Sequence, residues 1–252
     1  MRVFTCESDF DSIMTCIYDA WEWALKNGHE NMRIEREPIM QMTLFDEYVH
    51  IDRDREKSDK VASAILKKIS REAAVWVYYV TLHEKDHLDD IYRFLRVGFK
   101  EGKRTTQMLS FKPVITMERL SKTVGNEIHY GREFLRFDSM DDKVFVAHTE
   151  PKADTIFVVS QHFADRMPSE NWLIVDDGRK KAVVHPKDEE IYVIYLTDEQ
   201  LEELKQTEKN TDIYRDMWRT FFDAIAIKER ENYKCQRTLF PIWMRKHVTE
   251  FM

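Results

Sequence analysis

The chain has 252 residues, of which 43% are hydrophobic and 12% aromatic, so it can bury a core in one large domain or two small ones. Its three cysteines, Cys6, Cys16 and Cys235, are widely spaced and form no C-x-x-C pair. This excludes a disulfide framework and a zinc or iron–sulfur centre held by cysteines. No apolar signal segment opens the sequence and no run of about eighteen apolar residues occurs, so we expect a cytoplasmic protein without a membrane partner.

The net charge of −7 is unevenly distributed along the chain. Residues 93–136 hold ten Lys/Arg against four acids, and residues 228–246 hold six against two. Residues 176–208 hold ten acids against five bases. Two positive regions therefore lie apart from an acidic one, a separation that matters more than the overall charge for the choice of partner. Solvated helix faces would give the same pattern, and this alternative stays open.

The first half of the chain is predicted to be mainly helical, because apolar residues recur there at three- and four-residue steps. A short strand is expected at residues 2–6 and an extended segment at 32–42. Ser58 is the expected N-terminal cap of the second helix. The predicted helices cover residues 9–27, 58–69, 73–82 and 88–99, and a further one runs from Pro113 toward Gly131.

The pattern changes to alternation after the last of these helices. One more helix is expected at residues 156–167, between the second and third strands. Asp198 is expected to cap a short acidic helix, an amphipathic helix starts at Asp212, and Pro241 opens a final short one. The predicted strands cover residues 134–137, 143–149, 172–176, 181–185 and 191–196, with hairpin turns at 138–142 and 177–179.

These elements together predict an α+β protein. A mainly helical N-terminal region, residues 1–127, is joined to an α+β region, residues 128–252. The second region is expected to hold a small antiparallel sheet of about five strands, packed with basic C-terminal helices. The seam is expected near residues 124–130, and the pattern also allows one compact unit.

Residues His83, Glu84 and His87 match the H-E-x-x-H pattern of zinc metalloproteases. On a helix the two histidines would share one face and the glutamate could activate water. The spacer residues Lys85 and Asp86 are both charged, and no third ligand follows at a spacing typical of these enzymes. We therefore interpret the segment as a polar turn between two helices, and no metal site is predicted.

One other group of polar residues could carry acid–base chemistry. His162, Asp165 and Arg166 lie close together, so His162 and Asp165 are candidates for catalysis, with Asp176 as a third member. The alternative is a helix end with ordinary surface ion pairs. No glycine-rich phosphate loop and no G-x-S-x-G elbow occurs, so nucleophilic catalysis has no support in the sequence.

The segment that most strongly indicates a ligand is the basic, aromatic stretch near the C-terminus. Cations pair with phosphates and flat rings stack on bases, so this composition favours nucleic acid. Arginines near the first strand and on the helix between the second and third strands could add to the same surface. The residues expected to bind nucleic acid are Arg132, Arg136, Arg166, Lys228, Arg230, Tyr233, Arg237, Trp243 and Lys246.

Five motifs in a fixed order resemble an uncharacterised bacterial family associated with DNA repair and DNA metabolism. They are Tyr-Gly-Arg-Glu-Phe-Leu-Arg-Phe at 130–137, His-Phe-Ala-Asp-Arg at 162–166, Asn-Trp-Leu-Ile at 171–174, Trp-Arg-Thr-Phe-Phe-Asp-Ala-Ile-Ala-Ile-Lys-Glu-Arg-Glu-Asn at 218–232 and Trp-Met-Arg-Lys-His-Val-Thr-Glu-Phe at 243–251. The resemblance extends over most of the chain. Members of that family are typically encoded beside a radical-SAM protein, and in some bacteria the same domain is fused to a uracil-DNA glycosylase domain.

The resemblance implies a DNA-binding protein that works with a radical-SAM partner, with a uracil-DNA glycosylase as a further candidate partner. S-adenosylmethionine and an iron–sulfur cluster would then belong to the partner, because this chain lacks the three-cysteine cluster motif. No catalytic residues are established for the family, so none is assigned through it. Two other hypotheses stay open: an enzyme of glycosylase or nuclease type that acts directly on DNA, and a scaffold that docks its partner through the acidic region at 198–208 without binding DNA.

Overall fold

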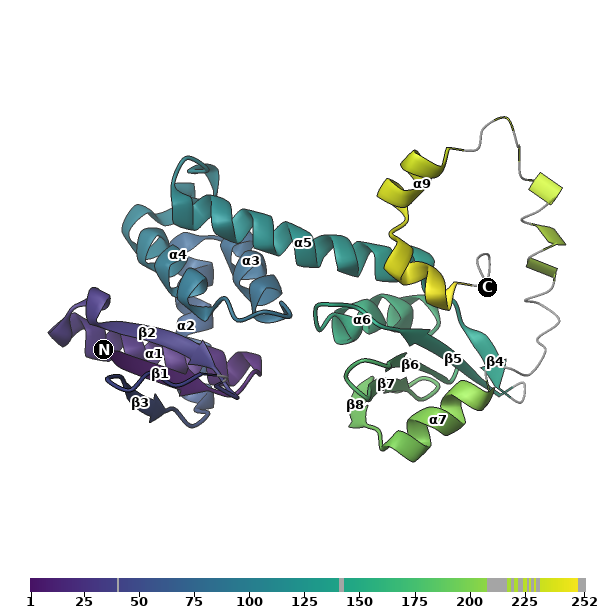
Figure 1. Cartoon of the computed structure of the whole chain (residues 1–252), viewed down its shortest axis with the longest axis horizontal. Helices are drawn as coiled ribbons and strands as arrows, with labels where there is room; N and C mark the ends of the chain where they lie inside the picture. Colours follow the sequence, from purple (N-terminus) through teal and green to yellow (C-terminus); the bar gives the residue numbers. More distant parts are fainter. Residues whose placement is uncertain are drawn as a thin grey trace. The chain divides into compact units, whose positions relative to one another are not determined.

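The computed structural model describes residues 1–39, 41–140, 143–207, 217–218, 220–221, 224–225, 227, 229 and 232–248 of the chain. The chain forms two compact units, Met1–Gly125 (unit 1) and Asn126–Met252 (unit 2), and the helix α5 (Lys112–Phe134) contributes to both (Figure 1). The α+β class predicted from the sequence is confirmed. None of the helices in the described ranges is long and apolar enough to cross a membrane.

Unit 1 contains a parallel three-stranded sheet with the order β2-β1-β3. Its strands are β1 (Arg2–Cys6), β2 (Met32–Arg36) and β3 (Glu47–His50). Parallel neighbours need a crossover, and α1 (Phe10–Asn27) supplies it between β1 and β2. Asp9 caps this helix, because its side chain accepts a hydrogen bond from Ser12 N at 3.1 Å.

The rest of unit 1 is helical, as predicted. A π-helical turn, η2 (Ile65–Ile69), continues α2, and the 3-10 turns η1 (His29–Asn31) and η3 (Gly102–Gln107) follow α1 and α4. The apolar faces of the helices and of the sheet form one core, in which Ile13 and Phe94 are fully buried. The remaining α-helices are α2 (Arg55–Ala64), α3 (Arg71–Thr81), α4 (Leu88–Glu101) and the start of α5.

One cap predicted for unit 1 is wrong, and one strand was missed. Ser58 lies inside α2, where its buried hydroxyl donates to Asp11 Oδ1 at 2.8 Å. Asp54 is the cap instead, because its side chain accepts from Lys57 N at 3.1 Å. The strand β3 was missed because none of its four residues is buried, so no alternation marks it in the sequence.

Unit 2 is built on a five-stranded sheet with the order β4-β5-β6-β7-β8. The sheet is mixed, whereas the sequence predicted an antiparallel one: β5 and β6 run parallel, and the other pairs are antiparallel. The helix α6 (Ile156–Arg166) is the reason, because strands joined through a crossover helix pair in parallel. The strands are β4 (Asp138–Met140), β5 (Val144–Thr149), β6 (Trp172–Asp176), β7 (Lys181–His185) and β8 (Tyr192–Tyr195).

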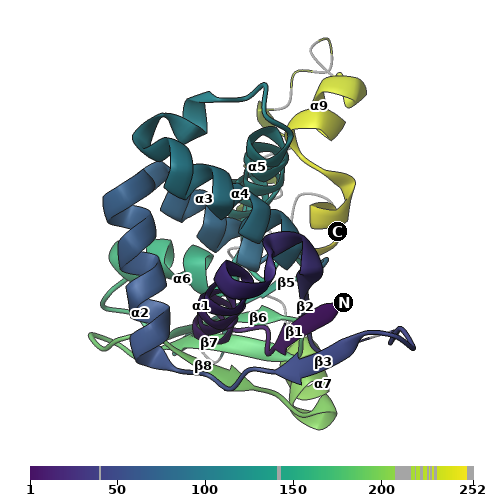
Figure 2. The same cartoon turned by 90° about the vertical axis from the view of Figure 1, so that its left-hand side faces the viewer.

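Different helices cover the two faces of this sheet (Figure 1, Figure 2). On one face, Ile156 and Val159 of α6 lie around the same small cavity as Ile174 of β6. On the other face, α7 (Asp198–Thr207) packs through Leu201 against a cluster that includes Val175. Successive strand residues point to opposite faces, so β6 is covered on both sides.

The last described segment is anchored to the end of α5. The helix α9 (Tyr233–Leu239) is followed by a 3-10 turn, η5 (Ile242–His247). Phe240 and Met244 belong to a buried cluster against which Tyr130 and Phe134 of α5 pack. The ring centroids of Phe134 and Phe240 are 4.3 Å apart. Apolar contacts therefore hold η5 on unit 2.

Several element boundaries in unit 2 differ from the prediction. Residues 134–137 do not form the predicted strand, because α5 continues to Phe134 and the first strand starts only at Asp138. Thr197 caps α7 in place of Asp198: Gln200 N donates to Thr197 Oγ1 at 3.3 Å and Thr197 N donates to Gln200 Oε1 at 2.9 Å. The turn at 177–179 and the short final helical turn after Pro241 are confirmed. Residues 141–142 of the predicted first hairpin turn and most of the helix predicted from Asp212 lie outside the described residues.

Candidate functional site

A buried histidine–aspartate pair lies where the two parallel strands of unit 2 end. His148 belongs to β5 and Asp177 follows β6 directly, so both stand at the carboxyl edge of the parallel pair. His148 Nδ1 lies 2.9 Å from Asp177 Oδ1, and the two side chains are only 1% and 6% exposed. The carboxyl edge of parallel strands is the usual place for a ligand site in open α/β sheets.

Charged side chains fix the loop that follows β5. Glu127 accepts a hydrogen bond from the loop backbone at 2.9 Å, and Arg179 donates to Pro151 O at 2.8 Å. Asp176 is fully buried and accepts from both the backbone N and the guanidinium of Arg179 at 3.0 Å. These bonds give the turn after β6 a structural role and hold the edge around His148 in place.

Burial acts on three carboxyl groups of this edge with different results. It raises the pKa of Asp176 and that of Glu127, and hydrogen bonds from the backbone together with the charge of Arg179 oppose the rise only in part. Burial also acts to raise the pKa of Asp177, but the hydrogen bond with His148 and nearby positive charges outweigh it, so this pKa is lowered. Asp177 is therefore held ionised at neutral pH.

The turn η5 places two more basic residues beside this pair. Lys246 Nζ forms an ion pair with Glu150 Oε2 at 2.7 Å. Burial lowers the pKa of His247, although the negative charge of Asp177 acts against that shift. Within the described part of the chain, the Nε2 atoms of His148 and His247 are buried without a hydrogen-bond partner. Unmatched buried polar atoms cost free energy, and catalytic sites are one of the places where they are retained.

His148 has the arrangement of a general base. A carboxylate that accepts from Nδ1–H fixes the imidazole tautomer in which Nε2 can take up a proton. Asp177 is placed to do this for His148, whose Nε2 is unmatched. Among the residues that the structure describes, no group of three His, Cys, Asp or Glu side chains is arranged to hold a metal ion.

The predicted nucleic-acid-binding residues on α9 are exposed to solvent. None of the seven residues of α9 is buried, and Tyr233 is 65% exposed. Lys234 and Arg237 lie on the same helix and are also exposed. The aromatic and basic side chains of α9 are therefore accessible to a ligand. Lys228 and Arg230 lie outside the described residues.

The other predicted nucleic-acid-binding residues lie on η5, α5 and α6 and, for Arg136, in the loop after α5. Trp243 and Lys246 are on η5, and Arg132 is exposed in the last turn of α5, the helix to which η5 is anchored. Arg136 Nη1 donates to Glu133 O, in the last turn of α5, at 3.1 Å. This nitrogen therefore satisfies a backbone carbonyl at the end of the helix. Arg166 is exposed at the end of α6. The structure thus brings Trp243 and Lys246 to the end of α5 and leaves Arg166 on a separate helix.

His162 and Asp165 do not form a hydrogen-bonded pair within the described residues. The ring of His162 is half-buried and lies 5.3 Å from that of Phe163, while Asp165 is exposed near the end of α6. The third proposed member, Asp176, is engaged with Arg179. A catalytic role for His162 and Asp165 stays a prediction.

The H-E-x-x-H segment forms a turn and not a helix. It joins α3 to α4, and the rings of His83 and His87 meet edge to face with centroids 4.6 Å apart. His87 Nδ1 lies 2.9 Å from Asp90 Oδ2, and His83 Nδ1 accepts from Lys85 N at 3.1 Å. The interpretation as a polar turn between two helices is confirmed.

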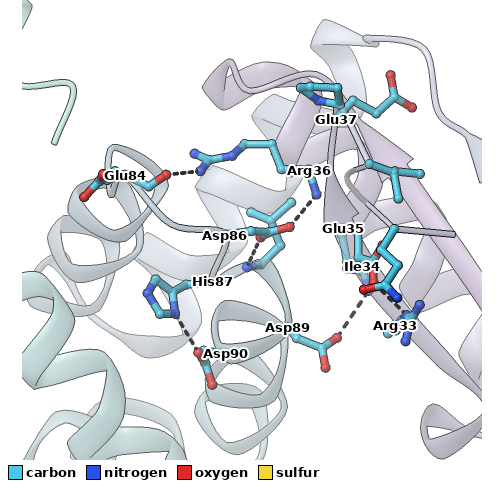
Figure 3. A pocket seen from close by; sticks show the side chains of 14 residues that line it. Arg33, Ile34, Glu35, Arg36, Glu37, Glu84, Asp86, His87, Asp89 and Asp90 are labelled. Carbon is cyan, nitrogen blue, oxygen red and sulfur yellow. Dashed lines mark hydrogen bonds and ion pairs between the residues drawn. The ribbon is translucent and has the colours of Figure 1, made fainter. Parts of the chain in front are cut away.

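The same turn lines a polar pocket of about 610 Å³ beside β2 (Figure 3). Asp86 accepts from Arg36 N at 2.6 Å and Asp89 accepts from Ile34 N at 3.2 Å, so both carboxylates bind the edge of the strand. The guanidinium of Arg36 donates to Glu84 O at 2.7 Å. Because these groups join α4 to β2, we do not take this pocket as the candidate site.

His148 and His247 were not predicted as site residues from the sequence. An antiparallel sheet gives His148 no special place, since only in a parallel pair do neighbouring strands end at the same edge. The predicted helix between the second and third strands was the signal that could have found it, because strand–helix–strand connections imply parallel pairing. His247 comes to the site through the packing of η5 on β5 and α5, which no local pattern encodes.

Residues 85–250 match the model of a domain of unknown function, DUF4130. The match spans more than half of the chain, so the protein belongs to this family. It contains the whole of the His148–Asp177 site and the described helices α9 and η5. Residues 1–84, which include the sheet of unit 1, lie outside the match. No curated protein matches the chain.

Proposed function

We propose that this protein binds DNA through the exposed basic and aromatic residues of α9 and η5. The observation that carries the proposal is the exposure of α9, a helix that buries none of its residues and presents Tyr233, Lys234 and Arg237 to solvent. Cations on such a surface neutralise backbone phosphates and release counterions. An exposed ring can stack on an unpaired base.

The turn η5 can extend this surface toward the end of α5. Lys246 is 65% exposed and its partner Glu150 is 47% exposed, so the ion pair between them contributes little and a phosphate can replace the carboxylate. Trp243 is half-buried and packs in the cluster that anchors η5. Tyr233 is therefore the better candidate for stacking, and Arg132 at the end of α5 adds a further exposed cation.

We further propose that DNA binding serves DNA repair or DNA metabolism together with a radical-SAM protein. The support for this role is the order of motifs between residues 130 and 251, and not the geometry of the site. S-adenosylmethionine and an iron–sulfur cluster would be held by that partner. A uracil-DNA glycosylase is a further candidate partner.

The test is fluorescence anisotropy with labelled single-stranded and duplex DNA at several salt concentrations. We expect binding that weakens steeply with salt. The double charge reversal K234E/R237E should weaken binding and reduce the slope of log K against log salt by about two, at about 0.9 per neutralised phosphate. The matched control K143E/K187E reverses two exposed lysines elsewhere in unit 2 and should bind like the wild type.

Two outcomes would contradict the proposal. Equal affinity of K234E/R237E and the wild type would remove α9 from the site. Failure of the wild-type protein to bind any DNA at low salt would end the proposal. Y233A tests base stacking separately from phosphate binding. Loss of the Tyr233 ring should weaken binding of single-stranded DNA more than binding of duplex DNA.

The His148–Asp177 pair favours a second function, hydrolysis of a bond in DNA. In uracil-containing DNA, His148 Nε2 would take a proton from a water molecule as the water oxygen attacks C1′ of the deoxyuridine, and Asp177 would stabilise the imidazolium that forms. The bond between C1′ and uracil N1 breaks, and the uracil anion that leaves takes up the proton from the imidazolium. H148Q should then abolish release of uracil from single-stranded and duplex uracil-containing DNA while DNA affinity stays the same, and its unfolding midpoint should fall because the pair with Asp177 is lost. Absence of turnover by the wild-type protein on these substrates and on undamaged DNA would remove this second candidate.

A further inference from the structure

Unit 1 contains a groove that the proposed function does not use. Its volume is about 510 Å³, within the range of small-molecule sites, and it is lined by α1, the α2–η2 segment and the end of α4. Among its lining residues, Ile17 and Val61 are buried. Ala64 also lines the groove, and its small side chain leaves space that a larger residue would fill.

Aromatic side chains line this groove. Tyr18 and Trp21 lie about one turn apart on α1, and Phe99 comes from α4. The rings of Trp21 and Phe99 meet edge to face with centroids 5.4 Å apart, and the ring of Trp21 also lies 5.2 Å from that of His29. These contacts fix the orientation of the half-buried Trp21. The groove therefore offers a flat, pre-oriented apolar surface.

Two lysines line the same groove, and their side chains have no ion-pair partner among the residues that the structure describes. Lys60 in α2 and Lys68 in η2 are both exposed, and neither forms a hydrogen bond or an ion pair with another described residue. The neighbouring Lys57, by contrast, is paired with Asp19 at 2.7 Å. Lys60, Ala64 and Lys68 follow one another at four-residue steps, so the two ammonium groups stand along one side of the groove.

We propose that this groove binds a nucleotide unit, with the base against Trp21 and Phe99 and the phosphate beside Lys60 and Lys68. The aromatic rings select a flat apolar group, and the unpaired ammonium groups select an anion. Glu22, the one acid among the lining residues, leaves the groove with a net positive charge and can accept a hydrogen bond from a base or sugar. The unit can be a free mononucleotide or one residue of a strand, and the two sources are separated below.

The test is isothermal titration calorimetry of the full chain with adenosine 5′-monophosphate, adenosine and inorganic phosphate. Adenosine 5′-monophosphate should bind at least about tenfold more tightly than either fragment, because it uses both parts of the groove. In the K234E/R237E variant, which removes the proposed DNA contacts of α9, a short oligo(dA) should bind more tightly than the mononucleotide if the natural occupant is a strand. It should bind more weakly if the natural occupant is a free nucleotide.

Two variants and one control place the site. K68E should weaken binding of adenosine 5′-monophosphate by at least about fivefold and leave adenosine unaffected. K67E reverses an exposed lysine of the same π-helical turn that does not line the groove, and should stay within about twofold of the wild type. A64F should weaken both ligands, since the ring would fill the space beside Val61.

The proposal fails if adenosine 5′-monophosphate does not bind to the wild-type protein and oligo(dA) does not bind to K234E/R237E. It also fails if K68E and K67E have equal effects, or if adenosine binds as tightly as its monophosphate. The site is independent of α9: K234E/R237E should bind the mononucleotide normally. Loss of DNA binding in that variant with normal mononucleotide binding would support both proposals separately.

Discussion

The contact between α5 and α6 in unit 2 gives a sharp test of how closely these helices approach. Gly131 is buried near the end of α5, and a Cβ added there would lie 2.8 Å from Val159 Cγ2 and 3.4 Å from Val159 Cγ1. Val159 is only 4% exposed, and its branched side chain is stiff at χ1, so it cannot easily move aside. We predict that Gly131→Ala lowers the free energy of unfolding.

The magnitude follows from two opposing effects. Forcing a methyl group into a filled core costs about 1–3 kcal/mol. Replacing glycine with alanine inside a helix stabilises it by about 1 kcal/mol. The expected net loss is therefore about 1 kcal/mol. Val159→Ala alone should cost about 2 kcal/mol through lost burial and a cavity. In the double variant Gly131→Ala/Val159→Ala, the methyl group at position 131 occupies part of that cavity. The double variant should therefore be more stable than Val159→Ala.

The assay is equilibrium urea unfolding of the full chain, followed by circular dichroism and tryptophan fluorescence, with comparison of the midpoint and slope for each variant. Two results would refute the reasoning. Stabilisation of Gly131→Ala by about 1 kcal/mol would mean that helix propensity acts alone and that α6 lies farther away. Strict additivity in the double variant would mean that residues 131 and 159 do not touch.

The charged groups around His148 give pH and salt effects that can be measured by thermal unfolding. Burial raises the folded-state pKa of Glu127, so its ionised form opposes folding: Glu127→Gln should raise Tm at neutral pH, and the gain should vanish as pH falls through that pKa. The folded-state pKa of Asp177 is lowered, so the ionised carboxylate stabilises the fold. This stabilisation is complete above the ordinary aspartate pKa and is lost as pH falls through the folded-state pKa. Asp177→Asn should therefore lower Tm at neutral pH and match the wild type in acid. The exposed pair of Glu150 and Lys246 should show a coupling of only about 0.2–1 kcal/mol in the cycle of Glu150→Gln and Lys246→Met, and less at high salt. The explanation for Glu127 is wrong if the Tm gain of Glu127→Gln does not change with pH. The explanation for Asp177 is wrong if Asp177→Asn still has a lower Tm than the wild type in acid. The explanation for the exposed pair is wrong if its coupling energy does not change with salt.

Local sequence patterns predicted those elements whose structure depends on residues close together in the chain. The strands β6 and β7 were predicted with their observed bounds, because two short apolar runs flank a turn with its own hydrogen-bonding residues. The cap of α2 could not be predicted in the same way. Ser58 and Asp54 are both good caps, and the choice depends on Asp11, which is distant in sequence and binds the hydroxyl of Ser58.

The candidate site was predictable only in part. The sequence composition indicated exposed aromatic and basic residues near the C-terminus, and α9 does expose Tyr233 and Arg237. The pairing of His148 with Asp177 joins residues that lie far apart in the chain and depends on the direction in which two strands pair. The continuous apolar run of β6 is typical of a strand that is covered on both faces, as in parallel sheets, but it does not show which strand is the neighbour.

The carboxylates of Asp86 and Asp89 have a consequence for the solubility of the protein. A strand at the edge of a sheet presents unpaired N–H groups, which are a template for addition of a strand from another molecule. In β2, the N–H groups of Ile34 and Arg36 are already occupied by these two side chains (Figure 3). The negative charges that satisfy the edge also repel an incoming strand's carbonyl oxygens. Detachment of α4 in a partly unfolded molecule would expose the N–H groups of β2 again. The segment around the start of α4 therefore protects this strand edge from aggregation, in addition to its place in the core.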